Sequence, residues 1–420
     1  MTRPHYAWAI AAVTFLVLLA SAGVRSTPGL LMVPLETEFG WSRALISTAV
    51  AINILLFGLI GPFAAGLMNR WGLRRTCAGS AALVSVGVLL TAQLHTPLQL
   101  ILLWGVVVGI GTGGTSMVLA AIVATRWFNE RRGVVLGALS AANATGQLLF
   151  LPFLARIIEH NGWRAASISV GSTAAVVAVI VWVFMRDSPE AMGIKPYGWH
   201  HTNPVPAKAM EPIPALFYAL RKPKFWLLAG TFFICGASTN GLVGTHLIPA
   251  CHDNGITEVR AAGLLAMMGI FDIFGTTASG WLTDRFSPSI LLAVYYLLRG
   301  LSLLALPAML AHGDTAQLNW FAMFYGLDWI ATVPPTVRLT SDEFGRENTG
   351  VVYGWIGAFH QLGASLAAFG AGTVRTITGD YYWSFITAAV LCFLASAAFI
   401  TTMRRKPAGT PQPVAAYLAG

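Results

Sequence analysis

Apolar runs long enough to cross a lipid bilayer recur along the whole of this chain, and they constrain its fold more than any other feature. A membrane-spanning helix needs about 20 mostly apolar residues. The chain has 420 residues, of which 56% are hydrophobic and 10% are charged, whereas soluble domains carry roughly 25% charged residues. Strands of a membrane β-barrel would instead be about ten residues long with alternating polarity. The sequence therefore predicts an all-α integral membrane protein.

We place twelve transmembrane helices along the chain, with boundaries good to a few residues. The first apolar run has no cleavage site of a signal peptide, so we expect it to be retained as a helix. The predicted spans are residues 7–33, 44–68, 74–93, 98–124, 133–157, 165–185, 225–250, 260–283, 288–311, 316–338, 348–374 and 382–403.

The distribution of basic residues predicts the orientation of these spans. An even number of spans puts both termini on one side, and 19 of the 26 Lys and Arg residues then lie on that side and five on the other. Because basic loops favour the cytoplasm, we expect a multi-pass protein of the inner membrane with both termini cytoplasmic. This topology accounts for the net charge of +9 without a nucleic-acid partner.

A charged segment rich in proline divides the chain into two halves of six spans each. Such a composition is typical of a linker that neither spans the membrane nor packs into a core. The predicted domains are an N-terminal six-helix bundle at 1–185, a cytoplasmic linker at 186–224, a C-terminal six-helix bundle at 225–403 and a cytoplasmic tail at 404–420.

The two halves carry similar sequence features at similar offsets. The turn Gly66-Leu-Met-Asn69-Arg70 is echoed by Gly280-Trp-Leu-Thr-Asp284-Arg285, and Pro34 is echoed by Pro249. Parallel repeats of six helices about an axis normal to the membrane form one large transporter architecture, whose binding sites lie near the midplane between the halves. We therefore predict two repeated bundles with a functional site between them.

Four charged side chains, two basic and two acidic, lie deep within the predicted spans: Arg25, Asp272, Arg299 and Asp328. A charge at the bilayer centre costs roughly 2.5 to 3.5 kcal/mol, so each needs a partner or a function. We assign Arg299 a structural role, bonded to Asp272 or to Asp328. Asp272 is either a proton site, which binds a proton when unpaired and releases it when a cation approaches, or a fixed member of an ion pair.

Arg25 is assigned to an anionic substrate. Pro28 has no N–H, so we expect the carbonyl of Val24 to lose its helical partner and the helix to kink beside Arg25. The alternative is that Arg25 snorkels toward the outer surface. Thr276 lies one turn after Asp272, so the two side chains share a helix face.

The paired charged turns, the loop Arg126-Trp-Phe-Asn-Glu-Arg-Arg-Gly133 and the six-plus-six layout together resemble the major facilitator superfamily. Within that family, Tyr6-Ala-Trp8 and Pro34-Leu-Glu-Thr-Glu-Phe-Gly-Trp-Ser-Arg43 look like the bacterial relatives of the proton-linked monocarboxylate transporters. The resemblance implies transport by rocking of two bundles around a central cavity.

The resemblance also implies roles for particular residues. Asp272 matches an acidic residue of helix 8 in the monocarboxylate branch, and Arg25 lies close to the position of a basic residue in helix 1. Thr276 stands where that branch has an arginine. In the N-terminal turn, Asn69 stands where the family has an aspartate.

Further polar residues lie in spans that usually line the cavity of this family. His360 in the eleventh span corresponds by the repeat to Asn143 in the fifth, and it is predicted to be a substrate contact, a proton relay or a packing histidine. Gln147 and Gln361 offer amides for carboxylate or hydroxyl oxygens. The predicted substrate-binding residues are Arg25, Asn143, Gln147, Thr276, His360 and Gln361.

Other residues are expected to control how the helices meet or end. Asn69, Arg70, Asp284 and Arg285 are predicted to latch the bundles together on the cytoplasmic side through charge-assisted bonds to helix ends. The run Thr332-Val-Pro334-Pro335 must interrupt the tenth helix. The glycine-rich run 109–114 lies within an apolar span, so we interpret it as a helix-packing surface rather than a phosphate loop.

The leading prediction is a secondary transporter of a small organic anion such as a monocarboxylate, coupled to protons through Asp272 or His360. We predict no enzymatic activity and no cofactor, and the four cysteines lack the spacing of metal ligands. The partners expected are the anion, the proton and the lipid bilayer, and the protein is expected to be a monomer. The alternatives are efflux of amphipathic compounds and a receptor or scaffold that does not transport.

Overall fold

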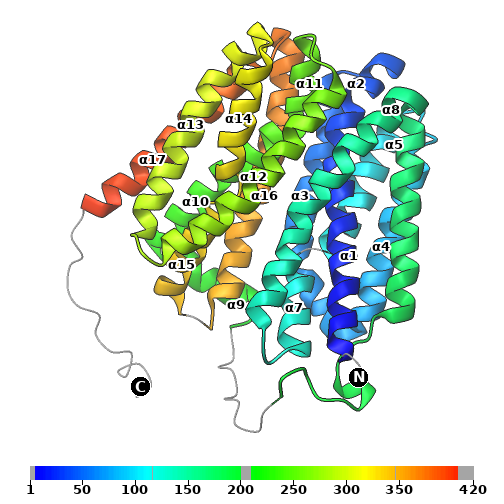
Figure 1. The fold of residues 1–420 in the computed structure, drawn as a ribbon, viewed down its shortest axis with the longest axis vertical. Helices are drawn as coiled ribbons and strands as arrows, with labels where there is room; N and C mark the ends of the chain where they lie inside the picture. The colour runs from blue at the N-terminus through cyan, green and yellow to red at the C-terminus, as the bar shows by residue number, and fades with distance from the viewer. Residues whose placement is uncertain (1–4, 116, 200–209, 346, 405–420) are drawn as a thin grey trace.

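The structure is a computed structural model, and it describes residues 5–115, 117–199, 210–345 and 347–404. These residues are almost entirely helical, and the β-type pairing found among them is one isolated bridge between Phe128 and Tyr197. Figure 1 shows the helices as two groups, which meet at the upper end of the view and diverge toward the lower end. The all-α fold predicted from the sequence is confirmed.

The first half of the chain builds one group of helices. The element α8 covers both the fifth and the sixth predicted spans, as two helices that meet at a kink at Gly162, where the backbone is not helical. The positive φ of 80° at Gly162 is tolerated because glycine lacks a Cβ. The elements are α1 (Tyr6–Ser26), α2 (Pro28–Phe39), α3 (Arg43–Trp71), α4 (Leu73–Thr91), α5 (Pro97–Leu100), the π-helix η1 (Ile101–Val108), α6 (Gly109–Gly114), α7 (Met117–Trp127) and α8 (Arg132–Phe184).

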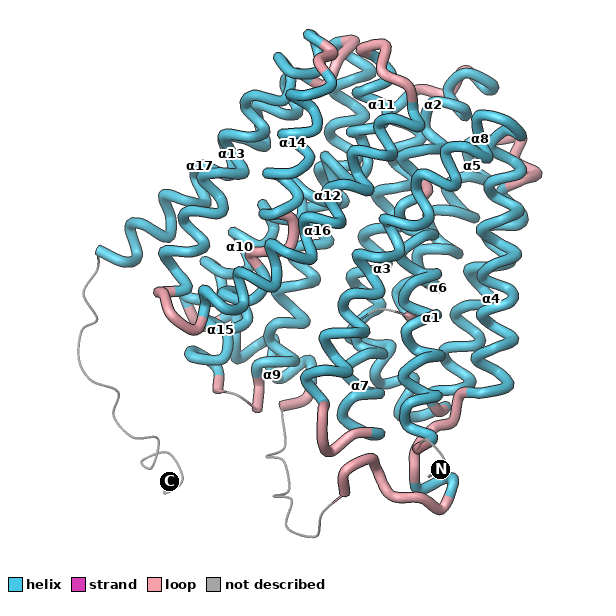
Figure 2. The backbone as a smooth tube through the Cα atoms, viewed as in Figure 1, coloured by secondary structure: helices cyan, strands magenta, loops and turns pink. Residues whose placement is uncertain are grey.

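The second half builds the other group, and two short helices lie in the segment between the halves (Figure 2). Those two are the 3-10 helix η2 (Glu190–Met192) and α9 (Pro212–Leu220). The second group consists of α10 (Pro223–Gly236), the π-helix η3 (Ala237–Val243), α11 (Gly244–Asp253), α12 (Glu258–Thr283), α13 (Pro288–His312), α14 (Thr315–Asp328), α15 (Val333–Phe344), α16 (Thr349–Thr378) and α17 (Tyr382–Arg404).

The twelve predicted spans all fall on these helices. Nine helical stretches of the described chain are long and apolar enough to cross a membrane by themselves. The other three predicted spans are the first part of α8, the broken pair α14 and α15, and the 30-residue α16, which carries polar residues. The twelve-helix arrangement therefore holds, with polar or interrupted helices among its members.

The glycine-rich run 109–114 packs against neighbouring helices, as predicted. A Cβ added at Gly113 would lie 2.7 Å from the Cβ of Ile60 on α3, and one at Gly111 would lie 2.6 Å from Val84 on α4. Both distances are shorter than a van der Waals contact allows, so only glycine lets α6 pack this closely on both helices.

The two halves pack against each other through α3 with α16 and through α8 with α12. In Figure 1 these pairs run through the middle of the molecule, and α2 and α11 meet at its upper end. In the same view the described start of α1 lies at the lower end, and α17 runs from the upper end to the left edge of the molecule. Each half thus contributes its own helices to one central interface.

Part of the connecting segment is packed, which the sequence did not predict. Ala215 and Ala219 of α9 are fully buried, and α9 packs on α16. Trp355 of α16 donates its indole N–H to the carbonyl of Pro212 at 2.8 Å. Proline and charge in the sequence indicated a linker, but small residues at helical spacing let α9 lie flat on its neighbour.

Two of the interrupted membrane helices of the described chain have an arginine close to the break or bonded to it. The first break separates α1 from α2 at Thr27, beside Arg25. The helix is interrupted next to Pro28, where a kink was predicted, but the carbonyl of Val24 accepts the N–H of Thr27 at 3.3 Å and is therefore not left free. The second break separates α14 from α15, and Pro334 lies in the first turn of α15, where its missing N–H does no harm.

Candidate functional site

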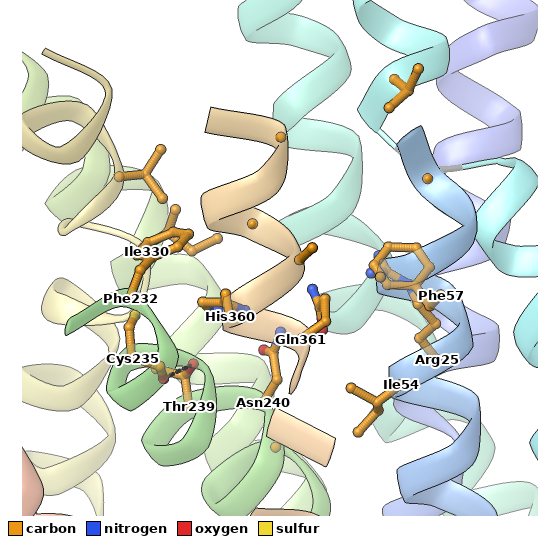
Figure 3. A pocket seen from close by; sticks show the side chains of 18 of the residues that line it. Arg25, Ile54, Phe57, Phe232, Cys235, Thr239, Asn240, Ile330, His360 and Gln361 are labelled. Atoms are coloured by element: carbon orange, nitrogen blue, oxygen red, sulfur yellow. Dashed lines mark hydrogen bonds between the residues drawn. The ribbon is translucent and has the colours of Figure 1, made fainter. Parts of the chain in front are cut away.

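A central cavity of about 750 Å³ lies between the two halves. Its walls come from α1, α2, α3, α7 and α8 on one side and from α10, η3, α11, α12, the break between α14 and α15, and α16 on the other. Met210 and Pro212, at the start of α9, also line it, so the cavity reaches the end of the molecule where α9 lies. Figure 3 shows side chains of both halves converging on this space.

Arg25 lines the cavity and does not extend toward the far surface. Its guanidinium lies over the ring of Phe57 at 4.4 Å from the ring centroid, and its Nε donates to the carbonyl of Ser21 at 3.4 Å. Figure 3 shows Arg25 and Phe57 side by side on the wall formed by the first half. The break at Thr27 leaves Arg25 in the last turn of α1, facing the space between the halves.

Asp272 of α12 also lines the cavity, on the opposite wall, and is 3% exposed. Its Oδ1 accepts the hydroxyl of Thr276 at 2.8 Å and the backbone N–H of Ile330 at 3.0 Å. Ile330 lies in the break between α14 and α15, where a helical partner for that N–H is missing. Asp272 therefore caps a broken helix as well as facing the cavity, whereas Thr276 is not among the lining residues.

Arg299 of α13 forms its ion pair with Asp328, and not with Asp272. Its Nε lies 2.6 Å from Oδ2 of Asp328, and the guanidinium also donates to the backbone carbonyls of Asp328 and Trp329. A further donor reaches the Sγ of Cys235 at 2.9 Å. Because Arg299 is 1% exposed and is not among the lining residues, its charge serves the second break rather than a ligand.

His360 and Gln361 of α16 both line the cavity. The ring of His360 lies 4.7 Å from that of Phe232. Gln361 lies against Gly58 of α3, where any Cβ would collide with it, so this amide sits at the contact between the halves. Asn143 and Gln147 lie on α8, but their side chains are outside the described residues.

The described side chains of the predicted latch are not among the cavity-lining residues. Arg285 stacks on Trp281 at 3.9 Å, and both Asp284 and Arg285 are exposed. Arg70 is exposed too, and the side chain of Asn69 is outside the described residues. Among the described side chains, no salt bridge joins Arg70 to Asp284. The two halves are therefore not joined by this predicted latch at the end of the molecule where the charged turns lie.

A network of charges at the opposite end joins the halves, and sequence reasoning missed it. Arg43 of α3, 2% exposed, is paired with Glu36 of its own half and donates to Asp253 at 3.2 Å and to the hydroxyl of Tyr381 at 3.1 Å in the other half. Arg375 also bonds Asp253, at 2.6 Å. The sequence showed Arg43 only as a loop charge, since its partners in the other half lie more than 200 positions away.

His246 belongs to the same closed end. One of its ring nitrogens lies 2.8 Å from the carbonyl of Ala368 and the other 3.2 Å from the hydroxyl of Tyr381. It is fully buried within the second half and is not among the cavity-lining residues. His246 therefore positions Tyr381, which in turn contacts Arg43 across the interface.

A membrane protein of two repeated helical halves, closed at one end and lined with polar groups between them, has the construction of a secondary transporter. A family model described as "Major Facilitator Superfamily" matches residues 14–368. The chain belongs to this superfamily of membrane transporters, as its charged turns and its six-plus-six layout predicted.

Individual relatives show which members of the superfamily this chain resembles. The uncharacterized MFS-type transporter YcxA of Bacillus subtilis is 27% identical over 406 residues, which cover 95% of each chain. Monocarboxylate transporter 11 of Mus musculus is 27% identical over 405 residues, covering 94% of this chain and 86% of that protein. The predicted similarity to the monocarboxylate branch is confirmed at the level of resemblance.

Solved structures share the fold. A bacterial homolog of the human lysosomal transporter Spinster, in an inward-facing and unoccupied conformation, superposes with a TM-score of 0.78 at 17% identity, covering 96% of this chain and 98% of that one. A D-xylose–proton symporter superposes with a TM-score of 0.71 at 15% identity, covering 94% and 97%. At these identities the likeness establishes the fold alone.

Proposed function

We propose that this protein is a secondary active transporter of a small organic anion such as a monocarboxylate, coupled to protons and working by alternating access. The observation that carries the proposal is the position of Arg25, whose guanidinium lies on the wall of a cavity between the two halves. A guanidinium is the side chain best suited to bind a carboxylate in a partly dehydrated site. The relatives named as monocarboxylate transporters support the same class of substrate.

Proton coupling is proposed at Asp272 or His360. Both line the cavity and both can change charge, so a proton arriving from that space can reach either one. Protonation of Asp272 would weaken its acceptor bonds to the hydroxyl of Thr276 and to the N–H of Ile330. The backbone at the break between α14 and α15 would then lose part of its stabilisation. Coupling would then act on a helix that is already interrupted.

Alternating access requires that the closed end open when the other end closes. The Arg43 network closes the end opposite α9, and we propose that this end faces away from the cytoplasm, in line with the excess of basic residues on the side of the termini. The turns at Asn69-Arg70 and Asp284-Arg285 would hold the cytoplasmic end in the other state. We propose a monomer in the inner membrane as the transporting unit.

The proposal is tested by transport into proteoliposomes. Uptake of labelled monocarboxylates is measured under an imposed inward proton gradient, with Arg25→Ala as the test variant and Arg338→Ala as the control, because Arg338 is 54% exposed and pairs with Asp342 one turn away. We expect uptake to be lost in Arg25→Ala and kept in Arg338→Ala. Full uptake in Arg25→Ala would refute the assignment of the anion site.

A second candidate function is efflux of amphipathic compounds. It is favoured by the aromatic and aliphatic walls of the cavity, where Phe57, Phe232 and Trp329 lie. Growth protection by overexpressed protein against such compounds, without uptake of any anion, would support efflux. Binding of a ligand without counterflow would instead identify a receptor that does not transport.

A further inference from the structure

The central cavity is large and mostly apolar for a transporter of the smallest carboxylates. Its volume of about 750 Å³ lies within the range of roughly 300 to 1,000 Å³ found for sites that enclose drug-sized ligands. Aromatic rings occur on several of its walls, and the lining includes Phe57, Phe232, Trp329, Tyr353 and Trp355. An acid as small as acetate would leave most of this apolar surface in contact with water.

The charges on the lining are few and unequal in their surroundings. Arg25 and Asp272 are the lining residues of the described chain that carry a full charge. Asp272 is held by Thr276 and by the backbone of Ile330, within the second half. Arg25 is the cationic lining residue of the described chain, on the opposite wall, so a single anionic group of a ligand would bind there.

The stack of Arg25 on Phe57 fixes the orientation of the guanidinium that would bind the anion. With 4.4 Å between the guanidinium carbon and the ring centroid, the ring covers one face of the guanidinium. A guanidinium binds a carboxylate through its N–H edge and not through its face, so the two contacts are compatible. An aromatic group attached to the carboxylate would then lie close to the edge or face of Phe57.

Polar groups face Arg25 from the second half. In Figure 3, Gln361, His360 and Asn240 point into the cavity from α16 and η3, across from Arg25 and Phe57. Phe232 lies beside His360, with 4.7 Å between the ring centroids. A ligand that reaches from Arg25 to these groups must therefore carry a second polar function at some distance from its carboxylate.

We propose that the transported anion is a carboxylate with an aromatic or similarly flat apolar body, bearing a second hydrogen-bonding group, and that Phe57 is the residue that selects it. This inference rests on the proposed function and specifies its substrate class. The carboxylate binds Arg25, the flat body lies among Phe57, Phe232 and Trp329, and the distal polar group bonds Asn240 or His360. Ligand contact with both halves favours their closure around it.

The test compares ligands at equal concentration by the rise in melting temperature of the purified full-length protein, since a ligand that binds only the folded state stabilises it by mass action. The probes are acetate, lactate, phenylacetate, 4-hydroxyphenylacetate and the neutral phenylacetamide. We expect 4-hydroxyphenylacetate to give the largest rise, phenylacetate a smaller one, and the remaining three none. Counterflow of labelled 4-hydroxyphenylacetate in proteoliposomes then confirms transport.

The variant Phe57→Leu removes the ring and keeps an apolar side chain, and Phe324→Leu is the control because Phe324 is 57% exposed on α14, outside the cavity. We expect Phe57→Leu to weaken 4-hydroxyphenylacetate binding about 2- to 12-fold, the range that aromatic contacts contribute, and Phe324→Leu to leave it unchanged. An equal loss in both variants would overturn the role of Phe57.

The remaining outcomes separate the inference from the proposed function. Binding and transport of lactate without phenylacetate or 4-hydroxyphenylacetate would overturn the aromatic class and leave anion transport standing. Binding of phenylacetamide as strongly as phenylacetate would overturn the carboxylate as the recognised group. Absence of binding and of transport for every carboxylate tested would overturn both the inference and the proposed function.

Discussion

In each half of this transporter an arginine accompanies a broken helix, and these two breaks are stabilised in opposite ways. At the break between α1 and α2, neutral groups of the same helix are sufficient: Thr27 donates its N–H to Val24 and its hydroxyl to the carbonyl of Gly23 at 2.9 Å. At the break between α14 and α15, the backbone groups without helical partners bond to charged side chains. Arg299 reaches two carbonyls and Asp272 reaches one N–H.

The difference explains why one arginine faces the cavity and the other does not. Because the first break needs no charge to satisfy its backbone, Arg25 can lie on the cavity wall over Phe57. The second break leaves several backbone groups without helical partners, and burying them unbonded would be costly. Arg299 is therefore committed to the fold, and the comparison predicts that mutations at the two breaks affect different properties.

The largest effect on stability is expected from Arg299→Ala. It leaves Asp328 buried without its partner and two carbonyls without a donor, which should lower the free energy of unfolding by about 3 to 5 kcal/mol. Denaturant titration in lipid bicelles measures the change. The double variant Arg299→Met with Asp328→Leu removes both charges and should recover much of the loss; a single variant that unfolds like the wild type would contradict the structural role.

Arg25→Ala should show the reverse pattern. Its loss removes the stack on Phe57, worth about 0.5 to 1 kcal/mol, and the long bond from Nε to the carbonyl of Ser21, and it leaves the bonds of Thr27 at the break in place. We expect stability close to that of the wild type in the same titration, together with loss of transport. A destabilisation as large as that of Arg299→Ala would remove the distinction between the two breaks.

Asp272→Asn tests whether the cap of the second break is also the proton site. The amide oxygen can still accept from Thr276 and from Ile330, so we expect a change in stability of no more than about 1 kcal/mol. If Asp272 carries the proton, accumulation driven by a proton gradient should disappear while counterflow persists. Unchanged accumulation would assign the proton to His360 or to another group.

Thr27→Val tests the first break directly, because it keeps the shape of the side chain and removes its hydroxyl bond to the carbonyl of Gly23. The loss of one buried hydrogen bond should cost about 0.5 to 1.5 kcal/mol. Titration beside Arg299→Ala compares the two breaks directly. An effect as large as that of Arg299→Ala would mean that the first break depends on more than local neutral bonds.

The general layout could be predicted from sequence because it depends on local composition. Each feature of this layout is predicted by residues that are neighbours in the sequence. These features are the apolar runs of spanning length, the charged turns after the second and eighth spans, and the glycine-rich run 109–114. The pairing of Arg299 was predicted only as a choice between Asp272 and Asp328. That choice depends on how α12, α13 and α14 rotate against one another, and no local pattern reports such rotations.

Other features lay beyond sequence reasoning for the same reason. The packing of α9 on α16 and the network around Arg43 join residues distant in the chain. The carbonyl of Val24 was expected to be free because Pro28 lacks an N–H, yet the preceding residue supplies a donor. A proline predicts which bond is lost, but the local backbone geometry decides which bond replaces it.

The sequence by itself determined that this chain is a helical membrane protein of two repeated halves, because hydrophobic length and the distribution of charge act on each segment separately. Only the tertiary structure decided which buried charges pair, which arginine faces the cavity and which end is closed. Those outcomes depend on contacts between helices, where a buried charge is stable only if the exact neighbours that the fold supplies can bond to it.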